Sequence, residues 1–179
     1  MMKRDGTESP QSLERRRKKL IRGYLQLSLR LLVIAAVLLI LLTQVFLICR
    51  MKGLDMYPAV RDGDLLVAFR LQKDYRKNDI VIYRHGEERR VGRIAAAGGD
   101  WIEIDETGTL RVNGTVQSDG IFYPTEKREG AEYPEQIPED RVYVLGDYRT
   151  GCRDSRDCGP VPSAELEGKV ISLFRRRGL

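Results

Sequence analysis

Histidine is almost absent from this chain, which has one, His85, among 179 residues. His85 lies in the polar stretch 84–87, which is typical of an exposed turn. A Ser-His-Asp triad would have to use His85 as its base, and no nucleophile motif accompanies it. The shortage of histidine also leaves no metal-ligand pattern, so we expect neither a catalytic metal nor a cofactor.

Cysteine is scarce as well, with three residues at positions 49, 152 and 158. Cys49 ends an apolar run, and the bulky Ile48 before it does not fit a lipoprotein acceptor site. Cys152 and Cys158 are six residues apart, a separation that a disulfide could bridge in an oxidising compartment. The sequence leaves open whether they form a disulfide or two free thiols.

Excess positive charge is lacking from most of the chain, although the formal net charge is +5. Residues 1–52 hold eleven Lys and Arg against three acidic residues, a net charge of +8. Subtracting this from +5 leaves −3 for the remaining 127 residues. Because the basic charge is confined to one terminal arm, we expect no nucleic-acid partner.

One long apolar run is present, Leu31–Cys49, in which Thr43 and Gln44 are the polar residues. As a helix rising about 1.5 Å per residue, it could span a hydrocarbon core of about 30 Å. A cleaved signal peptide would be shorter and end in small residues, whereas this run ends in bulky ones. Five basic residues, 15–19, precede it and favour a cytoplasmic N-terminus. We predict a basic cytoplasmic tail over 1–30, a transmembrane anchor over 31–49 and an extracytoplasmic domain over 50–179, in a single-pass protein of the cell membrane.

Beyond the apolar run, short β-like segments are separated by glycine, proline and aspartate. Asn113-Gly114 between two of them predicts a tight hairpin turn. The segment 118–140 is rich in Glu, Pro and Gly and is expected to be irregular. No segment of helical periodicity follows the anchor, so the outer domain should be mainly β. The predicted strands are 65–69, 80–83, 89–97, 101–104, 110–112, 115–116, 141–145 and 170–174.

Four motifs of the outer domain resemble, in order, those of the type I signal peptidases, which are membrane-anchored serine proteases with a Ser/Lys dyad. The first, residues 53–60, reads Gly-Leu-Asp-Met-Tyr-Pro-Ala-Val and is similar to Gly-x-Ser-Met-x-Pro-Thr-Leu. The second is Gly63-Asp64 followed by an apolar run. The third runs from Gly92-Arg93 to Gly99-Asp100 and is similar to Lys-Arg followed by Gly-Asp. The fourth, residues 146–156, is similar to Gly-Asp-Asn-Arg-x-x-Ser-x-Asp-Ser-Arg.

This resemblance implies an antiparallel β fold around a cleft that holds an extended peptide by strand addition. It also implies which residues form or support that cleft. The matching positions are Gly53, Met56, Pro58, Arg93, Gly146, Asp147, Arg149, Asp154, Ser155 and Arg156, with Cys152 at a serine position. Met56, Tyr57 and Pro58 could either form an apolar rim at the membrane or pack inside the domain.

Two positions depart from the family where its chemistry resides. Asp55 stands at the position of the nucleophilic serine, and Gly92 at that of the lysine base. Aspartate has no hydroxyl to attack a carbonyl, and glycine has no side chain to accept a proton. Arg93 cannot act as the base, because its guanidinium stays protonated. We therefore expect no Ser/Lys protease activity and interpret the protein as a pseudoenzyme.

Two functions remain open. Signal-peptidase-like proteins with altered dyads occur among Gram-positive bacteria, some of them beside sortase-built pili. The resemblance to these implies a non-catalytic protein that binds an exported protein, a pilin or a sortase during pilus assembly. The alternative is an active signal peptidase with an unorthodox group, either Cys152 as nucleophile or Asp55 paired with Asp154.

Overall fold

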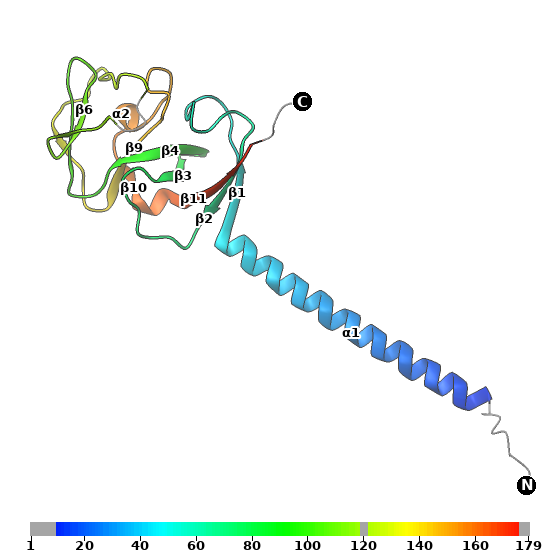
Figure 1. The fold of residues 1–179 in the computed structure, drawn as a ribbon. Helices are drawn as coiled ribbons and strands as arrows, with labels where there is room; N and C mark the ends of the chain where they lie inside the picture. Colours follow the sequence, from blue (N-terminus) through cyan, green and yellow to red (C-terminus); the bar gives the residue numbers. More distant parts are fainter. Residues whose placement is uncertain (1–9, 119–121, 176–179) are drawn as a thin grey trace, which may run out of the picture. The chain divides into compact units, whose positions relative to one another are not determined.

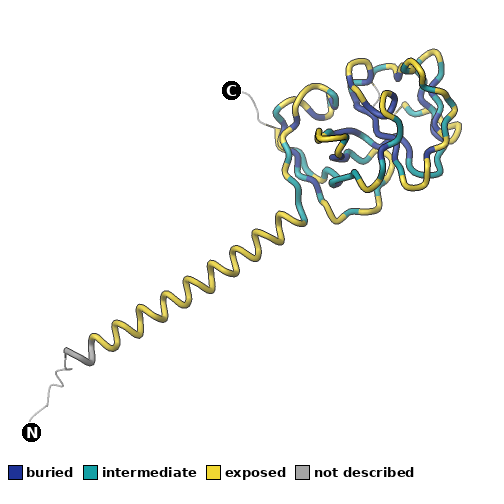
Figure 2. The backbone as a smooth tube through the Cα atoms, turned by 180° about the vertical axis from the view of Figure 1, so that it is seen from behind, coloured by how far each residue is buried: buried dark blue, intermediate teal, exposed yellow. Residues whose placement is uncertain are grey.

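The computed structural model describes residues 10–118 and 122–175, and the chain divides into two units, Met1–Thr43 and Gln44–Leu179 (Figure 1). Helix α1, Pro10–Val45, includes the segment 15–30, whose basic residues are 15–19, Arg22 and Arg30, and which continues directly into the apolar run. Residues 14–44 are exposed along the helix (Figure 2). An 18-residue window between Glu14 and Val45 reaches a mean hydropathy of 2.6, so the helix is long and apolar enough to cross a membrane.

The helix ends at Val45, four residues before the predicted end of the anchor helix. Strand β1, Phe46–Arg50, follows it and pairs antiparallel with β2, Leu65–Phe69. Leu47 and Cys49 pack against a core cluster, and Ile48 is exposed. The prediction of a helix over 31–49 was therefore wrong for residues 46–49. The physical reason is that apolar side chains give the same hydropathy whether lipid or a sheet surrounds them.

Within the described residues, the second unit contains two antiparallel sheets. The seven-stranded sheet has the order β1-β2-β11-β3-β4-β9-β10, and its strands are labelled in Figure 1. The four-stranded sheet has the order β7-β6-β5-β8. The remaining strands are β3 (Ile80–His85), β4 (Glu88–Ala96), β5 (Trp101–Ile104), β6 (Leu110–Val112), β7 (Thr115–Val116), β8 (Glu135–Gln136), β9 (Arg141–Leu145), β10 (Val161–Pro162) and β11 (Leu166–Phe174). A helical turn, α2 (Ser155–Cys158), and a 3-10 turn, Ser163–Glu165, complete the unit.

The expected mainly β, antiparallel domain is confirmed. Strands β2, β5, β6, β7 and β9 have the predicted bounds, whereas β11 begins four residues earlier than predicted. The turn at Asn113 and Gly114 is also confirmed, with φ angles of 51° and 75°. Both angles lie in the left-handed region that such a two-residue turn requires. Strands β1, β8 and β10 were not predicted from the sequence.

The buried residues of the second unit lie mainly on its strands (Figure 2). One buried cluster lies beneath the first motif and includes Met51, Met56, Val60, Leu66 and Ile82. Met56 is fully buried, so of its two predicted roles the structure shows packing. This anchoring of the first motif in the core positions the residues on either side of Met56, including Asp55.

Candidate functional site

The loop that carries Asp55 connects β1 to β2 and is held by hydrogen bonds between its own residues. Gly53, with φ of 83°, donates its N–H to the Asp62 carboxylate at 2.8 Å. The Tyr57 N–H donates to the Leu54 carbonyl at 2.8 Å, which closes a turn around Asp55. Asp55 is therefore held in place by backbone bonds and by the buried Met56 beside it. Its own carboxylate forms no hydrogen bond within the described residues.

The first and fourth motifs meet at the backbone of Asp55. The Tyr148 N–H donates to the Asp55 carbonyl oxygen at 3.0 Å. A Cβ atom on Gly146 would lie 2.7 Å from that oxygen and 2.4 Å from Cys152 Sγ. Gly146 must therefore lack a side chain for the two motifs to approach this closely.

Gly92 lies in β4, where it pairs with Val81 of β3. A Cβ atom on Gly92 would lie 2.4 Å from Val144 Cγ1 and 3.3 Å from Tyr83 Cε1. Both neighbours are almost completely buried. The space in which a lysine side chain would begin is thus already filled, and the packing around position 92 fits glycine.

Asp154 is the central acceptor of the fourth motif. Its carboxylate accepts hydrogen bonds from Arg156 Nε and Nη2 at 2.9 Å each and from the Gly146 N–H at 3.1 Å. It also caps α2 by accepting from the Arg156 N–H at 3.1 Å. The Arg156 side chain is fully buried and donates further to the Arg149 carbonyl at 2.6 Å. Because its lone pairs are occupied, the Asp154 carboxylate is a structural acceptor here and does not pair with Asp55 as a proton-sharing dyad.

The other residues of the fourth motif are also engaged in the scaffold. Ser155 Oγ accepts the Val144 N–H at 2.9 Å, which fixes α2 against β9. Asp147 binds Arg93 Nε and Nη2 at 2.8 and 2.7 Å, which joins the third motif to the fourth. The Asp147 carboxylate raises the pKa of the Arg93 guanidinium, which remains a cation. Arg149, 4% exposed, donates from Nη1 to Thr125 Oγ1 at 2.8 Å.

Cys152 is 2% exposed and donates its thiol hydrogen to the Asp154 carboxylate at 3.2 Å. Burial, followed by the negative charge of Asp154, raises the pKa of the Cys152 thiol to about 12. The thiolate, the nucleophilic form, is therefore disfavoured at neutral pH. Cys152 and Cys158 are both free thiols in this structure.

Asp55 itself is half-buried. Burial raises the pKa of its carboxyl, Arg90 opposes this shift, and the negative charge of Asp154 adds to it. Neither a hydroxyl nor an amine of a Ser/Lys dyad is present at the positions that the motifs indicate. The side chains here can bind and orient a ligand, but they do not form the activated nucleophile of this chemistry.

Asp55 opens onto a groove of about 810 Å³. One wall is β1, the edge strand of the seven-stranded sheet. The opposite wall is the first half of β4, which pairs with β9 only from Arg93 onward. Each wall therefore has a backbone edge that an extended peptide could hydrogen-bond. The groove is lined by 48–52, Asp55, 88–91, Gly151 and Arg153.

The basic residues of this groove were not predicted as site residues. They are Arg50, Lys52, Arg89, Arg90 and Arg153. Because residues 46–49 were predicted to belong to the anchor, β1 was not recognised as a wall of the groove. The clusters Arg50/Lys52 and Arg89/Arg90 are visible in the sequence, but their common location depends on the sheet order.

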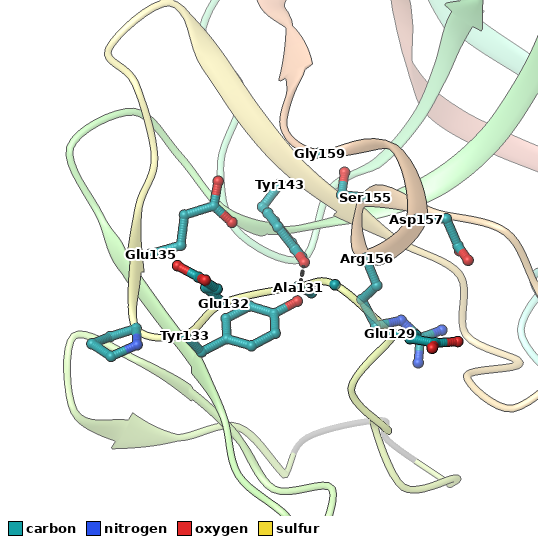
Figure 3. A pocket seen from close by; sticks show the side chains of 12 residues that line it. Glu129, Ala131, Glu132, Tyr133, Glu135, Tyr143, Ser155, Arg156, Asp157 and Gly159 are labelled. Atoms are coloured by element: carbon teal, nitrogen blue, oxygen red, sulfur yellow. Dashed lines mark hydrogen bonds between the residues drawn. The ribbon is translucent and has the colours of Figure 1, made fainter.

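A second cavity, of about 560 Å³, lies between the segment 129–135 and α2 (Figure 3). The side chains of Tyr133 and Tyr143 meet there, with their hydroxyl oxygens 2.6 Å apart (Figure 3). Four carboxylates also line it, those of Glu129, Glu132, Glu135 and Asp157. Of the predicted site residues, Ser155 and Arg156 border this cavity and Asp55 does not.

Comparisons with known proteins bear on the motifs. A family model described as signal peptidase, peptidase S26, matches residues 24–174. The chain is 31% identical over 161 residues to a signal peptidase I of Bacillus licheniformis, which covers 79% of this chain and 84% of that protein. It is 35% identical over 137 residues to a probable thylakoidal processing peptidase 2, chloroplastic, of Arabidopsis thaliana, which covers 68% of this chain.

The chain spans 35% of the length of that plant protein and 39% of thylakoidal processing peptidase 1 of the same plant. Among solved structures, a signal peptidase I from Enterococcus faecalis V583 matches with a TM-score of 0.45 and 27% identity. That match covers 55% of this chain and 97% of the other chain.

Proposed function

Because the chain belongs to the signal peptidase family, peptidase S26, we propose that it is a membrane-anchored, non-catalytic member that binds an exported polypeptide. The observation that carries this proposal is the packing at Gly92. The dyad lysine is missing there, and Val144 and Tyr83 occupy the space where its side chain would begin. Asp55 at the nucleophile position and the buried thiol of Cys152 leave no activated nucleophile in its place.

The groove between β1 and β4 is the site that we propose for the polypeptide. An exported protein is the partner class that the family favours, since signal peptidases act on proteins that cross a membrane. The resemblance to dyad-lacking, pilus-associated proteins supports a pilin or a sortase as the partner in pilus assembly.

The anchor that we propose is α1, with the basic residues 15–19 on the cytoplasmic side. The helical part of the apolar run, residues 31–45, rises about 22 Å, which is less than a hydrocarbon core of about 30 Å. The span therefore extends back into residues 24–30, where Arg30 would reach the interface with its long side chain. In this proposal the domain from Gln44 onward lies outside the cytoplasm.

The test incubates the purified full chain, in detergent micelles, with a fluorescent peptide that spans a signal-peptide cleavage site. We expect binding by fluorescence anisotropy and no product by mass spectrometry. A signal peptidase I assayed in parallel is the positive control for cleavage. Cleavage by this chain that is lost in Cys152→Ala or Asp55→Ala would contradict the proposal and support the active-peptidase alternative.

A further inference from the structure

We propose that the groove selects an extended segment that carries acidic side chains, in preference to a neutral or basic one. The inference rests on the proposed function, because it assumes that the groove holds a polypeptide. It adds the chemical class of that polypeptide, which follows from the charges along the groove.

The groove is much more positive than the unit that contains it. Residues 53–179 carry a formal charge of −3, and Arg50 and Lys52 bring the unit from Gln44 onward to −1. The groove lining, in contrast, contains five basic residues against Asp55 and Glu88, a formal charge of +3. The positive charge is thus a local property of this surface.

Internal ion pairs neutralise part of this charge. Arg90 Nη2 pairs with the Glu88 carboxylate at 2.7 Å, and Arg89 Nε pairs with Glu167. These pairs engage both arginines and use the groove's Glu88.

Three cations remain available to a ligand. Arg50, Lys52 and Arg153 are exposed and form no ion pair within the described residues. Arg50 and Lys52 belong to the wall that β1 begins, and Arg153 belongs to the loop after β9. An incoming peptide would therefore meet unpaired positive charge from two sides.

The spacing of these cations suits an extended ligand. Arg50, the last residue of β1, and Lys52, two residues further on, are both exposed, whereas Met51 between them is buried. Alternate side chains of an extended chain lie about 6.6 Å apart on one face. Acidic side chains at alternate positions of a peptide added along β1 would have the same spacing. Asp55, an acid without an ion pair within the described residues, disfavours an acidic ligand residue at its own position.

The experiment compares three labelled nonapeptides with alternating sequences: Ala-Asp, its isosteric neutral counterpart Ala-Asn, and Ala-Lys. Binding to the full chain is measured by anisotropy in nanodiscs of zwitterionic phosphatidylcholine, which contributes no net lipid charge. We expect the Ala-Asp peptide to bind at least 10-fold more tightly than Ala-Asn, and Ala-Lys to bind most weakly. The ratio should shrink between 50 and 300 mM salt, because exposed charges are screened.

The triple variant Arg50→Ser/Lys52→Ser/Arg153→Ser should abolish the preference, so that Ala-Asp and Ala-Asn bind with equal affinity. The matched control Arg61→Ser/Lys73→Ser/Lys77→Ser removes three exposed basic residues outside the groove lining and should preserve the preference. Equal binding of Ala-Asp and Ala-Asn by the unchanged chain would overturn the charge inference and leave the proposed polypeptide binding intact. If none of the three peptides binds, both the charge inference and the proposed polypeptide binding are overturned. If the preference for Ala-Asp is lost only in the control variant, the assignment of the preference to this groove is overturned.

Discussion

The fourth motif contacts the backbone of Asp55 through Tyr148, yet the groups of this motif are engaged much more fully than the groups at positions 55 and 92. In the fourth motif Asp154, Ser155 and Arg156 are buried. Asp154 accepts a hydrogen bond from Arg156, and Ser155 accepts one from the Val144 N–H. At the dyad positions, Asp55 forms no side-chain hydrogen bond within the described residues, and Gly92 has no side chain. This difference distinguishes the residues that stabilise the fold from the positions at which a protease of this family carries its catalytic groups.

The largest expected effect on stability comes from a substitution in the buried fourth motif. Arg156→Ala would leave the buried Asp154 carboxylate without its cation, a change that typically costs about 3–5 kcal/mol. Urea unfolding of the full chain in detergent, followed by tryptophan fluorescence, measures the loss. The neighbouring exposed Arg153→Ala is the matched control, expected to change stability by less than about 0.5 kcal/mol. Similar losses in both variants would contradict the role assigned to Arg156.

The next effect tests whether position 92 is adapted to glycine. Gly92→Ala places a Cβ against Val144 and should cost about 1–3 kcal/mol, as overpacking of a buried site does. Adding Val144→Ala should recover part of this loss, since it removes the atom that the new Cβ meets. A double-mutant cycle of unfolding free energies measures the coupling, expected at about 0.5–3 kcal/mol. Strict additivity of the two changes would show that the contact is unimportant.

The same packing predicts that the protease dyad cannot be restored by two substitutions. Asp55→Ser/Gly92→Lys should leave peptide cleavage undetectable, because Val144 and Tyr83 obstruct the lysine. Adding Val144→Ala to this pair opens the space and is the variant in which cleavage is expected to appear first. Mass spectrometry of the signal-peptide assay measures the product. Cleavage by the double variant alone would show that the cleft has stayed competent.

A smaller, pH-dependent effect is expected at the second motif. The hydrogen-bonded Arg175 holds the pKa of the buried Asp64 below its usual value. The pair therefore stabilises the fold above the unfolded-state pKa of about 3.9. This contribution is lost as the pH falls through the lower, folded-state value. Thermal unfolding between pH 3 and 7 should thus depend less on pH in Asp64→Asn than in the unchanged chain.

The smallest effect is expected at Asp55, where stability depends on pH in the opposite direction to that at Asp64. Burial raises the pKa of Asp55, so the stability linked to its protonation is present at low pH and lost as the pH rises through the folded-state value. Asp55→Asn should consequently be slightly more stable than the unchanged chain at pH 7, with the difference vanishing at pH 3. Differential scanning calorimetry of the variant and the unchanged chain measures this difference at both pH values. A loss of stability at pH 7 would indicate that Asp55 supports the scaffold.

The elements that were predicted correctly are those whose signals are local. The Asn113-Gly114 turn and the strand 65–69 are specified by residues adjacent in the chain. Strands β8 and β10, each two residues long, exist because β5 and β9 pair with them. Such strands leave no periodic pattern to detect.

The sequence by itself determined the order of the four motifs, the aspartate at position 55, the glycine at position 92 and the presence of one long apolar segment. The tertiary structure decided where that helix ends, since β1 is recognisable only through its pairing with β2. It also decided that Asp154 is engaged by Arg156 and that Val144 and Tyr83 fill the space beside Gly92. These outcomes depend on contacts between residues distant in the chain, and the chain's local pattern carries no record of which side chains will share a volume or a hydrogen bond.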